Sequence, residues 1–218
     1  MQIVAQCLNP SGGNCFEVFD MDPKALAQAR ERVERMAAAI AEMEKTDPSM
    51  VGFERHWIDF LLAHNTIFTK LEQGAKGNGR SQGWFGEVKS FRKQDELLRY
   101  LHHARNCAEH SLETTTLKQE FDVVPQTAWT ERIPPTEASK GVPGLRGYVG
   151  KPFSARIVPP GVRLRPVSDR GVEYLPPERH LGVELWKCDP LSVAKHAFDY
   201  LECLVTEAEE QFGVEQRP

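Results

Sequence analysis

The stretch DELLRYLHHARNCAEHSL, residues 95–112, combines a helix-period apolar face with a dense group of chemically able side chains. Its apolar residues recur at spacings of three and four, which places them on one side of a helix. These residues are Leu97, Leu101, Ala104, Ala108 and Leu112. On the same projection His103, Asn106 and His110 lie on the opposite side, and Arg105 lies at the edge of the apolar stripe. The stretch therefore predicts a bundle helix with a polar back.

Two helices are expected before this stretch and one after it. Asp22-Pro23 and Asp189-Pro190 each provide a capping acceptor followed by a proline at the first helical position, where its missing N–H costs nothing. Apolar residues at helical spacing then continue to about Lys45 and to residue 212. The same spacing predicts another helix over residues 51–73.

The segment between the second helix and residue 95 is expected to be mostly loop. Residues 74–83, GAKGNGRSQG, are rich in glycine and poor in apolar side chains, which predicts a mobile loop. Residues 84–92 are expected to form a short helix.

Residues 113–189 have a different character, because prolines scattered from Pro134 to Pro177 exclude long helices. Short strands are expected at 153–158, 162–167, 172–175 and 180–186. Ser168-Asp169-Arg170-Gly171 predicts a hairpin turn, with Gly171 available for a positive φ.

The expected fold class is mainly α, or α+β overall. Residues 20–112 and 190–212 are predicted to form an antiparallel four-helix bundle, because three helices leave an open seam that the last one can fill. Residues 113–189 are predicted to be a β-rich insertion between the third and fourth helices, and residues 1–19 an N-terminal arm. A chain of 218 residues is long enough to bury such a core.

Composition sets bounds on location and partners. The formal net charge is −4, which argues against binding polyanions over the whole surface. The five cysteines include no C-x-x-C pair, which favours reduced thiols in a cytosol. The N-terminal sequence lacks a basic leader, and no window reaches the roughly 18 apolar residues of a membrane span. A cytoplasmic protein without a membrane anchor is expected.

Positive charge is nevertheless concentrated in two segments. Residues 70–93 carry six basic residues against two acidic ones, interleaved with aromatic side chains, and residues 140–179 carry eight against three. The basic side chains of such segments can bind a phosphate backbone, and the aromatic side chains can stack on unpaired bases. The nucleic-acid-binding candidates are Lys76, Arg80, Trp84, Lys89, Arg92, Lys93, Arg163 and Arg165. The alternatives are a solvated basic loop anchored by its aromatics, and a protein interface.

Arg105 and His110 are the candidate reacting groups. RNA cleavage by the 2′-hydroxyl needs a base for that hydroxyl, charge stabilisation for the phosphorane oxygens and a proton for the leaving oxygen. Imidazole and guanidinium suit these tasks, and the scheme requires no metal. Asn106 lies four residues before His110, so its amide can orient the ring. The alternative is a polar helix face satisfied by water and neighbouring side chains.

The run LLRYLHHARNCAEH, with Arg105-Asn106 followed by His110, resembles the R-(N/D/H)-x3-H signature of the HEPN family (higher eukaryotes and prokaryotes nucleotide-binding). HEPN domains are four- or five-helix bundles, and many are metal-independent endoribonucleases of toxin–antitoxin, phage-defence and RNA-processing systems. The resemblance covers about residues 20–112 and 190–212 and leaves the insertion unexplained.

By this resemblance Arg105 and His110 are catalytic and Asn106 supports them. It also implies a homodimer with a composite RNA-cleaving groove, an antitoxin-type protein partner, and no cofactor or metal. Active members have an acidic or polar residue on an earlier helix, for which Asp59 and Glu54 are the candidates. Many HEPN domains are non-catalytic, so a nucleic-acid- or protein-binding module is the main alternative, and a structural protein is the third.

Other constellations are weaker. His56 and His64 lack a third ligand at metal spacing and are expected at the surface or the core edge. Gly77-Asn78-Gly79-Arg80 follows a helix and does not match a phosphate-binding loop. Cys107 is expected to be a buried, inert thiol.

Overall fold

The computed structural model describes residues 20–46, 51–111, 113–120, 122–125, 155–158, 160–186 and 188–213. Five helices account for most of these residues, with small antiparallel sheets beside them, so the mainly α prediction is confirmed. The helices are α1 (Pro23–Lys45), α2 (Val51–Gly74), α3 (Gly79–Gln94), α4 (Glu96–His110) and α5 (Pro190–Phe212). The predicted N-terminal arm and residues 126–154 lie outside the described residues.

The two Asp-Pro signals start helices as predicted. The side chain of Asp22 accepts a hydrogen bond from the backbone N–H of Lys24, and that of Asp189 accepts one from Ser192. Pro23 and Pro190 occupy the first helical turn in each case.

The prediction of a loop over residues 74–83 is wrong for its second half. Asn78 caps α3 by accepting a hydrogen bond from the Arg80 N–H at 2.8 Å, and the helix begins at Gly79. Ser81 is buried and donates to the carbonyl of Ala75, which ties the first turn to the end of α2. A cap and a tertiary contact therefore outweigh the low helix propensity of the glycines. The β-rich segment consequently falls between the fourth and fifth helices.

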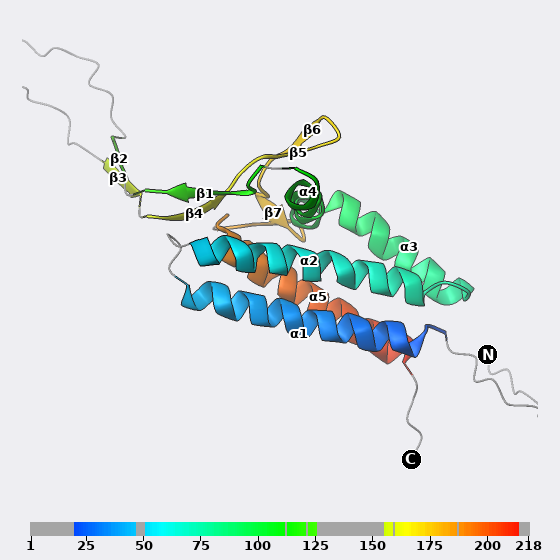
Figure 1. Cartoon of the computed structure of the whole chain (residues 1–218). Helices are drawn as coiled ribbons and strands as arrows, with labels where there is room; N and C mark the ends of the chain where they lie inside the picture. The colour runs from blue at the N-terminus through cyan, green and yellow to red at the C-terminus, as the bar shows by residue number, and fades with distance from the viewer. Residues whose placement is uncertain are drawn as a thin grey trace, which may run out of the picture.

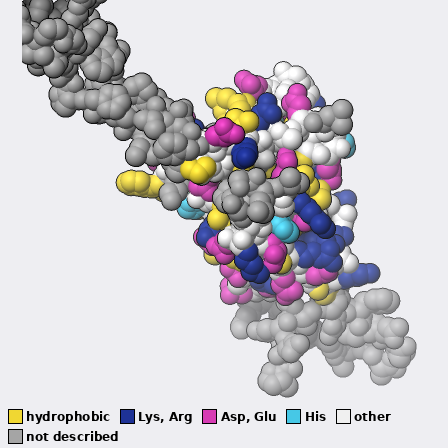
Figure 2. Space-filling view, turned by 60° about the vertical axis from the view of Figure 1, so that its left-hand side comes forward, with side chains coloured by type: hydrophobic (Ala, Val, Ile, Leu, Met, Phe, Trp, Pro, Cys, Tyr) yellow, Lys and Arg dark blue, Asp and Glu magenta, His cyan; other side chains and the backbone are white. Residues whose placement is uncertain are grey.

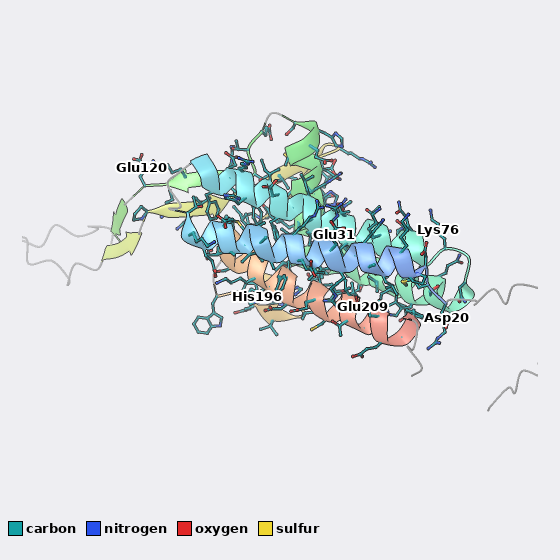
Figure 3. The ribbon with its side chains drawn as sticks, turned by 60° about the horizontal axis from the view of Figure 1, so that its bottom comes forward. Asp20, Glu31, Lys76, Glu120, His196 and Glu209 are labelled. Atoms are coloured by element: carbon teal, nitrogen blue, oxygen red, sulfur yellow. The ribbon has the colours of Figure 1, made fainter. Side chains whose placement is uncertain are left out.

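Helices α1, α2 and α5 run alongside one another, and α4 is viewed end-on where it crosses α2 (Figure 1). The guanidinium of Arg30 on α1 forms an ion pair with Glu209 on α5, which Figure 3 labels. Helix α1 also contacts the end of α2. There Gly74 lies so close to Ala25 that a Cβ added to the glycine would be 2.6 Å from the Ala25 Cβ. Close backbone approach explains the glycine at the end of α2.

The core lies between the helices and includes the apolar face predicted for α4. Leu97, Leu101 and Ala104 are fully buried, and Cys107 is buried as expected. Trp57 of α2 is also fully buried, and its Nε1–H donates to the hydroxyl of Thr115 at 3.0 Å. The strand-rich segment is thereby attached to the helical core.

Four two-stranded antiparallel sheets make up the described part of the β-rich segment. The pairs are β1 (Thr116–Gln119) with β4 (Gly161–Leu164), β2 (Asp122–Pro125) with β3 (Ala155–Val158), β5 (Val167–Asp169) with β6 (Val172–Tyr174), and β7 (Arg179–His180) with β8 (Val183–Glu184). In register, Thr116 opposes Leu164 and Val167 opposes Tyr174. The β1–β4 ribbon extends away from the helices in Figure 1, whereas β5 lies against α4.

The predicted hairpin turn is present between β5 and β6. Arg170 and Gly171 both have positive φ, 54° and 79°, as a turn of mirror-image type requires. The expected strand over 162–167 is divided, because β4 pairs with β1 whereas β5 pairs with β6. The expected final strand over 180–186 is instead the short β7–β8 hairpin.

Within the described residues, no helix combines the length and apolarity needed to cross a membrane.

Candidate functional site

The polar back of α4 faces the β5–β6 hairpin. The Nδ1 atom of His103 lies 2.7 Å from a carboxylate oxygen of Asp169, and the amide of Asn106 donates to the same oxygen at 2.9 Å. Hydrogen bonds from Asn106 and His103 hold the pKa of the Asp169 carboxyl below its usual range. Because this carboxylate can only accept, His103 carries its proton on Nδ1.

The ring of His103 is also fixed from the hairpin side. It stacks on Tyr174 with a centroid separation of 3.5 Å and an interplanar angle of 12°. The side chain of His103 remains 18% exposed, so its second nitrogen is not sealed into the core. An imidazole oriented by a carboxylate on one nitrogen is an arrangement suited to proton transfer on the other.

Arg105 and His110 have different surroundings. The guanidinium of Arg105 lies 2.5 Å from the carboxylate of Glu109, one turn further along α4, and 3.3 Å from the amide oxygen of Asn106. His110 is the last residue of α4 and is exposed. Arg105 is therefore held by neighbours on its own helix, whereas the imidazole of His110 is open to solvent.

A third group lies on the α3 side of α4. One terminal nitrogen of Arg92 lies 2.8 Å from the amide oxygen of Asn65 and 3.1 Å from Nδ1 of His102. The guanidinium also covers the ring of Phe68 at 4.0 Å from its centroid. Burial and the positive charge of Arg92 lower the pKa of His102 to about 4. Burial lowers the pKa of Arg92 itself to about 10, with a smaller contribution from Arg105 in the same direction.

Asn65, Arg92 and His102 border a cavity of about 340 Å³ between α2, α3 and α4. Its lining contains four basic side chains and two histidines, namely Lys89, Arg92, Lys93, Arg99, His102 and His103. The surface drawn in Figure 2 shows Lys and Arg side chains gathered in patches with acidic side chains between them. The protein therefore carries local positive patches despite its negative net charge.

Three of the other expected nucleic-acid-binding residues lie at a different place. Lys76 and Asp20 are at the same end of the helices, and Glu120 is at the opposite end (Figure 3). Arg80 lies 2.9 Å from the Asp20 carboxylate. The indole N–H of Trp84 donates to Glu207 at 3.0 Å, and its ring packs against Phe212, so Trp84 is not a free stacking platform.

Arg163 and Arg165 belong to the strand-rich segment. Arg163 lies exposed on β4. Arg165 follows β4. Its backbone N–H donates to the carbonyl of Thr115, and its backbone carbonyl accepts from the hydroxyl of Tyr100. The structure thus brings Lys89, Arg92 and Lys93 together and leaves the other expected residues apart from them.

The N-terminus of α4 anchors a second part of the β-rich segment. Asp95 caps the helix by accepting from the Leu98 N–H at 3.0 Å, and it also accepts from Nδ1 of His180 at 3.0 Å and from the Leu181 N–H at 2.9 Å. Burial raises the pKa of Asp95, but the hydrogen bonds from His180 and the two backbone N–H groups outweigh it, so the pKa lies below its usual value. The pair is almost completely enclosed.

The remaining sequence-based candidates contribute little to this site. His64 is fully buried, not at the surface or core edge as expected, and burial lowers its pKa well below the usual value. Glu54 and Asp59 lie on α2, and neither hydrogen-bonds to Arg105 or His110 within the described residues. The described part of the chain contains no group of three or more His, Cys, Asp or Glu side chains arranged to hold a metal ion.

Comparison of the chain with protein-family models gave no match, and neither curated proteins nor solved structures gave one.

Sequence reasoning did not single out Asp169, Tyr174, Arg99 and His102 as site residues. In the sequence Asp169 stands out only as a residue of the predicted hairpin turn, a position where Asp is common. No local signal connects residue 169 with residues 103 and 106, because the contact depends on how the hairpin docks on α4.

Proposed function

We propose that the protein is a HEPN-like, metal-independent endoribonuclease that cleaves single-stranded RNA by attack of the 2′-hydroxyl. In this proposal α1, α2, α4 and α5 form the HEPN-like four-helix bundle, α3 is an additional helix, and residues 113–189 are an insertion. The observation that carries the proposal is the arrangement on α4, where Arg105, Asn106 and the exposed His110 come directly after His102 and His103, which line the basic cavity.

Each residue has a chemical task in the proposed reaction. As the 2′-hydroxyl attacks phosphorus, the exposed imidazole of one His110 takes its proton, and His110 of the second copy gives a proton to the 5′-oxygen as the bond from that oxygen to phosphorus breaks. The guanidinium of Arg105 stabilises the charge that develops on the phosphorane oxygens. Asn106 contacts Arg105 and Asp169, so it supports the position of the guanidinium. Glu109 is displaced from Arg105 by the phosphate, which exchanges one anionic partner for another.

The proposal includes a homodimer in which two copies of α4 form one RNA groove. A single chain offers one Arg105 and one His110, whereas a composite groove offers two of each. Sedimentation velocity at micromolar concentration is expected to give a dimer. A monomer under these conditions would contradict the composite groove.

Cleavage assays with the purified chain test the catalytic assignment. Labelled single-stranded RNA is incubated in EDTA with wild type, Arg105→Ala and His110→Ala. Matched controls are Arg35→Ala and His196→Ala, since both residues are exposed and lie on other helices. Loss of cleavage only in the first two variants is expected, and persistence of cleavage in either of them contradicts the assignment.

A non-catalytic HEPN-like module that binds nucleic acid or protein is the second candidate. Two observations favour this candidate. The Arg105 guanidinium is already paired with Glu109, and large apolar side chains are exposed in the β-rich segment. The large exposed apolar side chains of the described residues all lie in that segment, namely Leu117, Val172, Leu175, Leu181, Val183 and Trp186. Such exposure is typical of protein interaction sites, including one for an antitoxin-type partner. RNA binding without cleavage by wild type on varied RNAs would favour this candidate.

A further inference from the structure

The basic cavity between α2, α3 and α4 carries an excess of positive charge. Its lining contains four Lys or Arg side chains but one carboxylate, that of Glu72. Glu72 lies 2.8 Å from Lys89, so its charge is largely committed to that lysine. In the described residues, Arg92, Lys93 and Arg99 form no ion pair with a carboxylate.

Arg92 is the most constrained of these cations. Its contacts are the amide oxygen of Asn65, Nδ1 of His102 and the ring of Phe68, none of which carries a negative charge. Its Nε–H is buried without an acceptor. No carboxylate of the described residues contacts this half-buried guanidinium, and the charge of Glu72, which favours its charged form, is shared with Lys89. Buried charges normally have a directly paired partner. An anion bound in the cavity would provide such a partner.

Arg92 also has donors left for such an anion. Both short contacts use the same terminal nitrogen, and no hydrogen bond within the described residues uses the other. Because two neutral acceptors and a ring fix the plane of the guanidinium, the free donors are held in place before a ligand arrives. This preorganisation reduces the entropy cost of binding.

His102 adds a neutral donor. A guanidinium can only donate, so Nδ1 of His102 accepts from Arg92 and the ring proton resides on Nε2. The low pKa keeps the ring in this neutral form at physiological pH. His102 lines the cavity, and its Nε2–H is not among the described polar atoms buried without a partner.

We propose that this cavity binds a phosphate group, with Arg92 as the fixed donor, His102 as a neutral donor and Lys93 and Arg99 as surrounding cations. Guanidinium and ammonium groups together are the usual partners of phosphate oxygens. A volume of about 340 Å³ lies within the range of small-ligand sites, so it admits a phosphate together with an attached group. The inference deepens the proposed function, since the same basic residues would contact RNA, but phosphate binding does not require cleavage.

Calorimetric titration of the full chain provides the test. The ligands are inorganic phosphate, adenosine 5′-monophosphate, and adenosine as the uncharged control. Binding of both phosphates but not of adenosine is expected. Arg99→Gln and Lys93→Gln alter exposed side chains and should fold normally, and each is expected to weaken phosphate binding roughly tenfold. Arg35→Gln on α1 is the matched control and should bind like wild type.

Arg92→Lys keeps the charge but loses the fixed fork of donors, and is expected to weaken binding more than either exposed variant. Circular dichroism verifies that this variant is folded. No binding of phosphates by wild type at millimolar concentration would overturn the inference, as would unchanged affinity in folded Arg92→Lys and in both exposed variants.

Oligoribonucleotides with and without a 5′-phosphate identify the source of the phosphate. A requirement for the 5′-phosphate supports a terminal or mononucleotide phosphate, and equal binding that is weakened in Arg99→Gln supports a backbone phosphate.

Titration of His110→Ala separates the inference from the proposed function, because phosphate binding should persist in this variant while cleavage is lost. Phosphate binding by a chain that never cleaves RNA would leave the cavity assignment intact and contradict the proposed enzyme.

Discussion

His103 and Asp169 are 66 residues apart in the chain, yet Nδ1 of the imidazole lies 2.7 Å from the carboxylate. The contact joins the polar back of α4 to the turn of the β5–β6 hairpin, and the stacked ring of Tyr174 covers it from the strand side. One carboxylate thus determines the ring orientation of His103 and the amide orientation of Asn106.

Replacement of Asp169 by alanine is expected to destabilise the protein by about 1–3 kcal/mol, because His103 and Asn106 both lose their hydrogen-bond acceptor. Urea denaturation followed by circular dichroism measures the change. Asp199→Ala, at an exposed position on α5, is the matched control and should differ little from wild type. Equal stability of the two variants would show that the contact contributes nothing to folding.

Asp95→Ala is expected to lower the free energy of unfolding by about 2–4 kcal/mol, because the helix cap and the hydrogen-bond partner of buried His180 are lost together. Asp22→Ala provides a comparison in which only an exposed cap is removed, for an expected cost of about 1 kcal/mol. Thermal unfolding of both variants gives the ranking. If Asp22→Ala were the more damaging, the anchoring role of Asp95 would be wrong.

Lowering the pH is expected to reduce the free energy of unfolding, because Asp95 and Asp169 become protonated. Both carboxyl pKa values are lowered in the folded state, so the stabilisation that they contribute is complete above their unfolded values, near pH 4, and is lost as the pH falls through the folded values. Urea denaturation of wild type and Asp169→Asn at several pH values measures this. The difference in free energy of unfolding should shrink below about pH 4. A difference that is constant between pH 7 and pH 3 would contradict it.

His102 is expected to remain neutral throughout the physiological range. Because its pKa is lowered to about 4, the folded state binds fewer protons than the unfolded state between that value and the ordinary 6.5. The stability contributed by His102 therefore rises with pH across this interval and is constant above it. Nuclear magnetic resonance of the imidazole carbon-bound protons follows the titration, and a midpoint above pH 6 would contradict the Arg92–His102 arrangement.

The fold was predictable where local signals decide it. Asp22-Pro23 and Asp189-Pro190 start helices because a cap and a proline act within one turn, and the spacing of Leu97, Leu101 and Ala104 reports directly which side of α4 is buried. The start of α3 was missed because its glycines have low helix propensity, which Asn78 and the buried Ser81 overcome through capping and tertiary contact.

The candidate site was predictable only on its own helix. Arg105, Asn106 and His110 are close in sequence, so the motif is visible without a structure. Asp169 reaches His103 only because the hairpin docks on α4, and no periodicity encodes that distance. Likewise, the clustering of Arg92 with His102 depends on the angle between α3 and α4, whereas the charge of residues 70–93 alone does not distinguish Arg92 from Arg80.

The positive φ values of Arg170 and Gly171 determine where Asp169 points, since the turn immediately follows it. Gly171→Val is expected to lower the free energy of unfolding by about 1–2 kcal/mol, because a branched side chain disfavours this backbone conformation. It should also displace the Asp169 carboxylate from His103. Gly161→Val is the control, since a Cβ there meets nothing within 4 Å and no positive φ is required. Urea denaturation measures both, and equal costs would contradict the role of the turn.

Surface turns usually tolerate substitution better than the elements that they connect. In this chain the exposed tip of the β5–β6 hairpin should behave in the opposite way. Variation at Gly171, which contributes no side chain of its own, would be transmitted through Asp169 to the imidazole of His103, so a mutational tolerance map should show an intolerant position on the outside of the molecule.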